Sequence, residues 1–409
     1  MMSIKPLHRS PISLDDLING KLPIIICGAG IVGNILSQIC EKIGIKITAF
    51  CDNNIRKTDS AVNGLEVIHT SKLGEIYPDA IFIISISDIK DIVDQLHDLG
   101  YGKWSDCLFI KHHDFANLVA DFPPELVSFA FNTCMLCQES FLSPDKLFLR
   151  SVDLIITERC SMHCRDCSNL MQYYQHPQDD NLDSILHAID VLCQCIDEMN
   201  EFRLIGGEPL MNRQCHLITR HLIAEPKVRK IIIYTNGTLL PTAEQLPDFI
   251  SKKVFFMITD YGLISRKLHE LVKMLKENKI AYYVHSSGNW TNCSQITPHH
   301  RTPEQQQELF CRCCAKNLLT LSDGLLLGCP FIANAIRLKA VPCQCSDYID
   351  LVKNIDGGMP PAEMKEQIRA FVNNSKYFET CDFCNGRSLG DPAIPPAIQT
   401  DHPLDYRKY

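Results

Sequence analysis

The chain has 409 residues, of which 45% are hydrophobic and 22% are charged, and its net charge is −8. These values are typical of a globular protein with two or three domains, and they exclude a disordered or fibrous chain. The acidic balance argues against a nucleic-acid partner. We expect no membrane partner, because no segment approaches the ~18 consecutive apolar residues of a membrane span, and the lack of an apolar leader predicts a cytosolic protein.

The first 120 residues alternate apolar runs with helical periods. Strands are expected over residues 22–27, 45–51 and 80–85, and helices up to about residue 43 and over residues 89–99. This order predicts a doubly wound, Rossmann-like domain over residues 1–120.

A glycine-rich turn follows the first of these strands and opens a helix. Gly28, Gly30 and Gly33 have GxGxxG spacing, and Asp52 closes the second strand. Glycines permit a tight turn, a helix N-terminus attracts phosphate, and the acidic residue can bind ribose hydroxyls. The domain resembles small domains that bind a nucleotide or nucleotide sugar at the front of sugar-modifying enzymes. The alternative is a domain that keeps the turn and binds nothing.

Residues 121–150 are expected to form a connector, because the pair Pro123-Pro124 and the step Ser143-Pro144 interrupt them. Cys134 and Cys137 lie in this stretch. One CxxC pair cannot complete a tetrahedral metal site, so we interpret both cysteines as structural.

Strand–helix alternation restarts at residue 151. Strands are expected over residues 152–157, 202–205, 230–234, 254–259 and 281–285, and helices over residues 182–199, 214–223, 242–251 and 265–277. These repeated units predict a partial (β/α)6 barrel of the TIM type over residues 151–300. An irregular, cysteine-rich extension follows over residues 301–409.

Three cysteines follow the first barrel strand: Cys160, Cys164 and Cys167. Clustered cysteines in a reducing compartment more often hold metal or do redox chemistry than form disulfides. Iron–sulfur clusters usually take four thiolates, so three would leave one iron open for an external ligand. The alternative is a zinc site in which His163 or a distant residue is the fourth ligand, but the three-residue gap after Cys160 fits zinc less well.

The CxxxCxxC pattern resembles the signature of the radical S-adenosylmethionine (SAM) superfamily. Two further marks of that family follow in order, and the resemblance covers residues 151–300. They are Gly206-Gly207-Glu208-Pro209 at the end of the second strand and Thr235-Asn236-Gly237 at the end of the third.

The resemblance implies that the three cysteines bind a catalytic [4Fe-4S] cluster, and that the amine and carboxylate of SAM chelate its fourth iron. It implies that Gly206, Gly207 and Glu208 contact the methionine amine and that Asn236 contacts the cosubstrate. An electron donor such as flavodoxin or ferredoxin would feed the cluster, which splits SAM to a 5′-deoxyadenosyl radical.

Two acidic residues lie near the expected pocket. The residue before the third cysteine is usually aromatic in the family and is Asp166 here, which puts the adenine contact at that position in doubt. Asp260, after the fourth strand, would face the pocket, or else would be a solvated residue at the strand end.

Eight cysteines lie beyond the expected barrel. They are Cys311, Cys313, Cys314, Cys329, Cys343, Cys345, Cys381 and Cys384. Cys329 follows a hairpin-like return after Gly324, and the last two have CxxC spacing.

This arrangement resembles the SPASM and twitch extensions, which hold auxiliary clusters. It implies one auxiliary [4Fe-4S] cluster on Cys311 or Cys314 together with Cys329, Cys381 and Cys384. Eight cysteines would also suffice for two such clusters. The competing interpretation is a structural zinc knuckle.

Three functions fit these features. The first is a radical enzyme that oxidises, epimerises or rearranges a sugar or nucleotide sugar, the second is a peptide-modifying radical enzyme, and the third is a non-catalytic redox or ligand sensor. The GGEP and TNG marks argue against the sensor, which needs no cosubstrate pocket. The N-terminal domain favours a small-molecule substrate over a peptide.

Overall fold

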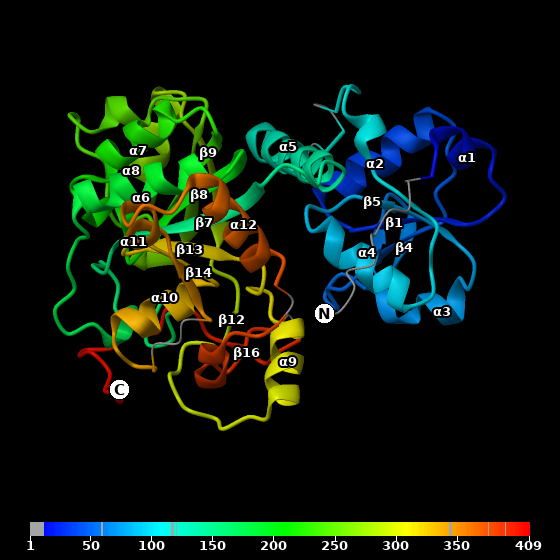
Figure 1. Ribbon diagram of the computed structural model, residues 1–409. Coiled ribbons are helices and arrows are strands. Elements are labelled where there is room, and N and C mark those ends of the chain that lie inside the picture. Colours follow the sequence, from blue (N-terminus) through cyan, green and yellow to red (C-terminus); the bar gives the residue numbers. More distant parts are fainter. Residues whose placement is uncertain are drawn as a thin grey trace. The chain divides into compact units, whose positions relative to one another are not determined.

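The computed structural model describes residues 12–58, 60–115, 118–119, 121–342, 346–374, 376–388 and 390–409. The chain divides into two compact units, Met1–Asp145 and Lys146–Tyr409 (Figure 1). Cys343 and Cys345 lie outside the described residues. Within the described ranges, every helix is too short or too polar to cross a membrane.

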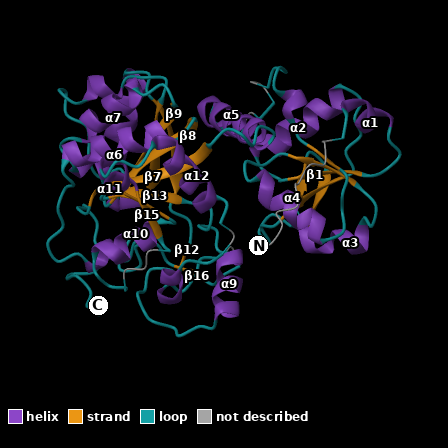
Figure 2. Ribbon diagram, viewed as in Figure 1, coloured by secondary structure: helices purple, strands orange, loops and turns teal. Residues whose placement is uncertain are grey.

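The first unit is a mainly parallel sheet with the strand order β3-β4-β2-β1-β5-β6. Its central strand β1 is buried on both faces because helices cover both, as Figure 2 shows. One face packs against α2 and the other against α4. The elements are α1 (Leu14–Asn19), β1 (Ile24–Cys27), α2 (Ile31–Lys42), β2 (Ala49–Asp52), β3 (Ala61–Val62), β4 (Leu65–His69), α3 (Leu73–Ile76), β5 (Ile81–Ile84), α4 (Ile89–Asp98) and β6 (Trp104–Ser105).

The stretch expected to be a connector forms a long helix instead, α5 (Pro124–Phe141). Its proline lies in the first turn, where no N–H is needed. Phe131 and Cys134 are buried in the core of the first unit. Gln138 ties the helix to the sheet, because its amide donates to the carbonyl of Ile84 at 2.6 Å and accepts from the amide of Cys107 at 2.8 Å. The first unit therefore extends beyond residue 120.

The second unit is built on a sheet with the order β11-β10-β9-β8-β7-β13-β14-β15. Strands β7 to β11 are parallel and lie in chain order, and β13 adds in parallel to the free side of β7. Their bounds, with the helices between them, are β7 (Phe148–Thr157), α6 (Leu182–Cys195), β8 (Glu198–Gly206), α7 (Cys215–Ala224), β9 (Val228–Thr235), β10 (Val254–Asp260), α8 (Leu268–Glu277) and β11 (Ala281–Ser286).

The helix expected over residues 242–251 is only a short 3-10 turn, Leu246–Phe249. Pro241 precedes this stretch and Pro247 lies inside it. Since proline lacks an N–H and blocks an α-helix from continuing past it, the apolar spacing there could not produce a full helix.

The C-terminal extension begins with a helix and a tight hairpin. Asp323 and Gly324, between β13 and β14, have φ of +51° and +76°, as a two-residue hairpin turn requires. The remaining elements are β12 (Trp290–Thr291), α9 (Pro303–Arg312), β13 (Leu319–Ser322), β14 (Leu325–Leu327), α10 (Pro330–Arg337), β15 (Tyr348–Asp350), α11 (Leu351–Asp356), α12 (Pro361–Val372) and β16 (Ala393–Ile394).

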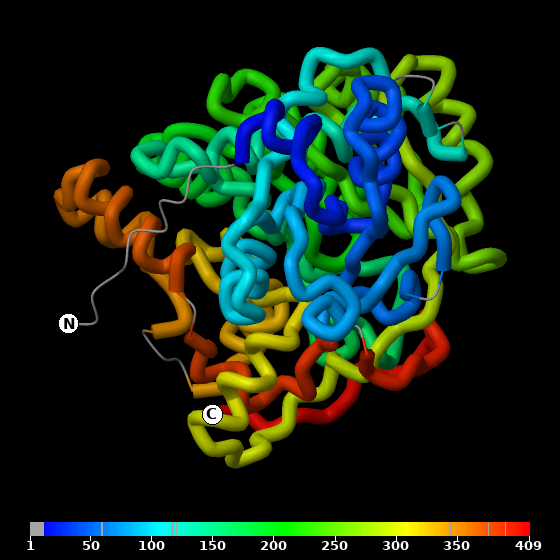
Figure 3. Tube along the Cα trace, turned by 90° about the vertical axis from the view of Figure 1, so that its right-hand side faces the viewer, coloured from blue at the N-terminus to red at the C-terminus, as the bar shows by residue number. Residues whose placement is uncertain are grey.

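The extension folds back onto the barrel strands. Ile155 of β7 and Ile205 of β8 belong to a buried cluster with Phe310 and Phe378, against which Cys329 and Cys381 pack. β16 also pairs with β12, so the end of the trace (red in Figure 3) returns to the segment that follows β11.

Candidate active site

The three cysteines of the predicted cluster loop follow the carboxyl end of β7. Cys164 is buried, and Cys160 and Cys167 are partly buried. The amide of Cys167 donates to the carbonyl of Cys164 at 3.3 Å, which folds the loop into a turn. The side chain of His163, considered above as a zinc ligand, is exposed. No three His, Cys, Asp or Glu side chains of the described ranges converge as they do around a single metal ion.

The C-terminal tail lies along this loop. Gln399 forms an antiparallel bridge with Cys164, and its side-chain amide donates to the Cys164 sulfur at 3.3 Å. The same side chain accepts a hydrogen bond from the amide of His163 at 2.7 Å, and the amide of Arg165 donates to Ile398 at 2.7 Å. Sequence reasoning missed this contact, because no local pattern marks residues 398–400 as partners of a loop more than 230 positions earlier.

The two glycines of the GGEP motif allow β7 and β8 to end side by side. Gly206 has φ of +133°, and a Cβ there would lie 2.1 Å from the carbonyl oxygen of Thr157. A Cβ on Gly207 would lie 2.1 Å from the carbonyl oxygen of Arg159. The amides of Gly207 and Glu208 instead donate to those two carbonyls, at 3.0 and 2.8 Å. Any larger residue would push this strand end away from the cysteine loop.

Glu208 joins the GGEP loop to the TNG loop. Its carboxylate, which is 1% exposed, accepts hydrogen bonds from the amides of Asn236 at 2.8 Å and Leu210 at 3.2 Å. The side chain of Asn236 in turn donates to Ser161 Oγ at 3.2 Å and lies 3.8 Å from the sulfur of Cys160. The three predicted motifs are thus brought together at the ends of adjacent strands.

Aromatic side chains stand beside the cysteine loop. Tyr261 and Trp290 pack against the cluster formed by Met162 and Cys164, with their ring centroids 6.1 Å apart. Asp166, where the family usually has an aromatic residue, is instead buried and paired with Arg165 at 2.9 Å. The sequence singled out Asp260, the last residue of β10. In the structure it is the neighbouring Tyr261 whose ring lies beside the three thiols.

Burial keeps the thiols protonated in the metal-free protein. Removal from water raises the pKa of Cys164 to about 11, and it also raises the pKa of Cys160 and Cys167. The neighbouring thiols add to the effect at Cys160 and Cys164. Because metals bind thiolates, loading a metal here must release protons.

A second group of thiols lies in the C-terminal extension. Cys329 caps the start of α10, and its surroundings include Cys313, Cys381 and Cys384. Burial raises the pKa of Cys381 to about 12. The loop that carries Cys381 is held by the buried carboxylate of Asp347, which accepts from the amides of residues 379 and 380.

The position of α9 decides which cysteine near residue 311 joins this group. Cys311 is exposed, and its sulfur accepts a hydrogen bond from the side chain of Gln307 in the same helix. Cys313 is partly buried and faces Cys381 and Cys384. Cys314 is exposed but lies next to Cys313. Cys293, which the sequence did not single out, is buried, and its carbonyl lies 3.8 Å from the Cys384 sulfur.

The three glycines of the turn in the first unit differ in how closely other atoms pack against them. A Cβ on Gly28 would lie 2.4 Å from Ile86, and one on Gly33 would lie 2.0 Å from the carbonyl oxygen of Gly28, so packing requires both glycines. Gly30 is open, with Lys57 Nζ 4.0 Å from a Cβ placed there.

Asp52 is engaged within this turn. Its carboxylate accepts from the amide of Ala29 at 3.0 Å and pairs with Lys57 at 3.0 Å. The acidic residue expected to reach a ribose therefore also holds the glycine loop in place.

The buried carboxyl of Glu208 predicts a pH-dependent stability of the metal-free protein. Burial raises the pKa of Glu208 from 4.5 to about 7. The folded state therefore holds this proton more tightly than the unfolded chain, so the stabilisation is complete below about pH 4.5 and is lost as the pH rises through about 7. The unfolding free energy of the wild-type protein should fall by roughly 2–3 kcal/mol between about pH 5 and pH 8. Glu208→Gln should abolish this fall, and denaturant unfolding measures it. The exposed Glu244→Gln should keep the wild-type profile, and parallel curves for wild type and Glu208→Gln would contradict the expectation.

Two family models match the chain. The model of the radical SAM superfamily matches residues 154–286, and that of the C2185-like N-terminal domain matches residues 20–104.

Among characterised relatives, a GTP 3′,8-cyclase of Clostridium acetobutylicum is 28% identical over 145 residues, which are 32% of this chain and 45% of the relative. A GTP 3′,8-cyclase of Stenotrophomonas maltophilia is 35% identical over 91 residues, which are 22% and 27% of the two chains. The chain thus spans less than half the length of these relatives.

Among solved structures, BtrN in complex with AdoMet and 2-DOIA has a TM-score of 0.38 at 15% identity, covering 60% of this chain and 98% of BtrN. The enzyme anSMEcpe with bound AdoMet and a peptide has a TM-score of 0.27 at 14% identity, covering 33% and 42%. The family match spans the strands that carry the cysteine loop, the GGEP motif and the TNG motif. Residues 154–286 are therefore a radical SAM domain.

Proposed function

We propose that the chain is a radical SAM enzyme that modifies a sugar or nucleotide-sugar type small molecule. The observation that carries the proposal is the meeting of three thiols with the GGEP and TNG loops at the carboxyl ends of β7, β8 and β9. In parallel α/β barrels this edge forms the active face. A sensor that only held a cluster would have no use for the two additional loops.

The donor set fits a [4Fe-4S] cluster with one open iron. Cys160, Cys164 and Cys167 would hold it, and a three-thiolate set leaves room for the methionine end of SAM. When bound, the cluster and SAM supply an electron and a 5′-deoxyadenosyl radical. The contribution of the protein is binding, orientation and exclusion of water.

The remaining residues of the site have distinct tasks in this proposal. The backbone at Gly206 and Gly207 would form the part of the wall that meets the methionine amine. The buried carboxyl of Glu208 lies behind it, where the charge of the amine would favour the ionised form of the carboxyl. Asn236 holds the start of the cysteine loop. Tyr261 offers the aromatic surface for adenine that Asp166 does not provide.

The proposal predicts the outcome of anaerobic reconstitution. Wild-type protein should cleave SAM to 5′-deoxyadenosine when dithionite is added, measured by chromatography. Replacing Cys160, Cys164 or Cys167 by alanine should remove about four irons per chain and lower this activity on the order of 100-fold or more. The matched control Cys193→Ala, buried in α6, should keep iron and activity.

Two results would overturn the proposal. One is zinc, or no metal, at the cysteine loop of wild-type protein prepared without oxygen. The other is the failure of iron-loaded protein to form 5′-deoxyadenosine with any candidate substrate present.

We further propose one auxiliary [4Fe-4S] cluster in the extension. The support is the shared surroundings of Cys313, Cys329, Cys381 and Cys384, all of which have thiol pKa values raised by burial. This set has Cys313 where Cys311 or Cys314 was expected, because the side chains of Cys311 and Cys314 are both exposed. A cluster here would accept an electron from a substrate radical, which would favour a net two-electron oxidation.

The double variant Cys381→Ala, Cys384→Ala should lose about four irons per chain while the catalytic cluster remains. Cys313→Ala should lose the same iron, and the exposed Cys311→Ala should not. Iron and sulfide analysis measures both. An unchanged iron content in the double variant, or zinc in its place, would contradict the auxiliary cluster.

The first unit would bind the nucleotide part of the substrate. Its glycine turn, its helix start and Lys57 offer the groups that phosphate prefers. The partial relatives named GTP 3′,8-cyclase act, by that name, on a nucleotide. A separate family model matches residues 20–104, which supports treating the first unit as a domain distinct from the radical SAM domain.

Gly30 provides a clean test of this binding. Its φ of −107° is open to any residue, so Gly30→Ala should fold normally while placing a methyl group where a phosphate would approach. For a nucleoside diphosphate sugar that the wild-type protein binds, we expect the substitution to lower the affinity on the order of tenfold or more, measured by calorimetry. Tight binding that survives the substitution, or a complete lack of nucleotide binding in wild type, would contradict the assignment.

A further inference from the structure

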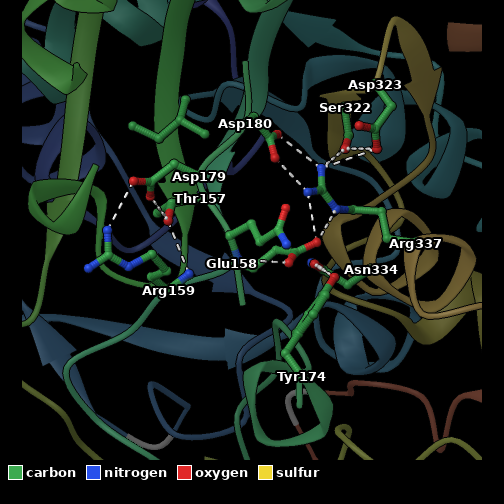
Figure 4. A network of polar contacts seen from close by, with 12 residues as sticks. Thr157, Glu158, Arg159, Tyr174, Asp179, Asp180, Ser322, Asp323, Asn334 and Arg337 are labelled. Atoms are coloured by element: carbon green, nitrogen blue, oxygen red, sulfur yellow. Dashed lines mark hydrogen bonds and ion pairs between the residues drawn. The ribbon is translucent and has the colours of Figure 1, made fainter. Parts of the chain in front are cut away.

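Helix α10 carries a thiol at one end and a largely buried arginine at the other. Cys329 is its N-cap, and Arg337 is its last residue. The Arg337 side chain is 10% exposed and lies among carboxylates that belong to the barrel (Figure 4). It binds Asp180 through two nitrogens, at 2.6 and 3.0 Å, and Glu158 through two nitrogens, at 2.9 and 3.3 Å.

The two carboxylates stand at the base of the catalytic cysteine loop. Glu158 precedes Cys160 by two residues, and its amide donates to the carbonyl of Gln178 at 2.8 Å. The amide of Asp180 donates to the carbonyl of Ile156 on β7 at 3.2 Å. Arg337 therefore binds the chain at the point where the cysteine loop leaves β7.

The same helix contacts the far side of the loop. Tyr174, which lies beyond the last loop cysteine, donates from its hydroxyl to Asn334 Oδ1 at 2.8 Å. Asn334 is fully buried, and its amide donates to the carbonyl of Pro330 in the first turn of α10. The helix thus holds both flanks of the loop, at residues 158 and 174, by directional polar contacts.

The charge balance makes Arg337 the key member of this network. One guanidinium faces the carboxylates of Glu158, Asp180 and the more exposed Asp323, while Ser322 Oγ accepts at 2.9 Å. Without the arginine, two carboxylates whose side chains are only 15% and 13% exposed would face each other in a poorly solvated site. Removing one partner of a buried ion pair is strongly destabilising, because an uncompensated charge remains. The planar fork of arginine also fixes direction, which a lysine would not.

We propose that Arg337 is a positioning residue that fixes the auxiliary thiol Cys329 relative to the catalytic cysteine loop, so that the geometry of the two metal sites is set together. The inference rests on the proposed function, since it assigns a metal site to each end of the helix. The coupling between α10 and the cysteine loop depends on side chains of this chain alone, so it can be measured in the metal-free protein.

Hydrogen exchange of the metal-free protein, followed by mass spectrometry, tests the coupling. Arg337→Met should speed exchange on the order of tenfold or more both in residues 158–174 and in residues 330–337. The matched control is Asp356→Asn, which breaks the exposed pair between His187 of α6 and Asp356 of α11, a 3.0 Å contact that also joins the barrel to the extension. The control should leave both segments unchanged.

A second variant keeps the test decisive if Arg337→Met fails to fold. Glu158→Gln removes charge only on the loop side and leaves the Asp180–Arg337 pair intact, yet it should also loosen α10, because the coupling acts in both directions. Arg337→Lys should restore part of the protection of α10 and less of that of the loop.

Exchange that rises only on the mutated side, or rises equally in Asp356→Asn, would overturn the proposal. Iron analysis of wild type decides the proposed function separately. If the wild-type loop holds no cluster while the reciprocal exchange effect persists, the positioning role stands and only its catalytic meaning fails.

Discussion

The close approach of two backbone segments is the constraint on which the site depends. The backbone after β8 donates hydrogen bonds to carbonyls at and just beyond the end of β7, where a single Cβ on Gly206 or Gly207 would overlap a carbonyl oxygen. This contact fixes the start of the cysteine loop against the GGEP loop. Glu208 then extends the arrangement to the next strand by accepting the amide of Asn236. Three motifs distant in sequence thereby share one edge of the sheet.

Desolvation determines the chemistry at that edge. The thiols of the loop and the carboxyl of Glu208 are withdrawn from water, and both hold protons more tightly than they would in solution. Such perturbed groups are typical of functional sites. A metal or a cationic cosubstrate at this edge favours the ionised forms of these groups, so its binding is coupled to the release of their protons.

The C-terminal extension does more than add cysteines. It covers the inner face of β7 and β8, sends α10 to the base of the cysteine loop, and returns as a tail whose Gln399 reaches the sulfur of Cys164. Hydrogen bonds to cluster sulfurs are among the factors that set reduction potential. The extension therefore contacts the cysteine loop directly, and the two thiol groups belong to one packed structure.

The sequence by itself determined the features that depend on local pattern. The apolar periods placed the central strands β1, β2 and β5 of the first unit and β7 to β11 of the second, together with helices α2, α4, α6, α7 and α8. The cysteine spacing and the GGEP and TNG residues marked the candidate site, and Asp323-Gly324 marked the hairpin. Each of these is set by neighbours within a few residues, through backbone conformation or side-chain periodicity.

Only the tertiary structure decided the rest. It placed Cys313, rather than Cys311 or Cys314, toward the other thiols. It also brought Gln399 and Tyr261 to the cysteine loop and made residues 124–141 a helix of the first unit. These outcomes depend on contacts between residues far apart in the chain. The physical reason is that burial, charge pairing and side-chain direction are properties of the packed whole, which no local spacing encodes.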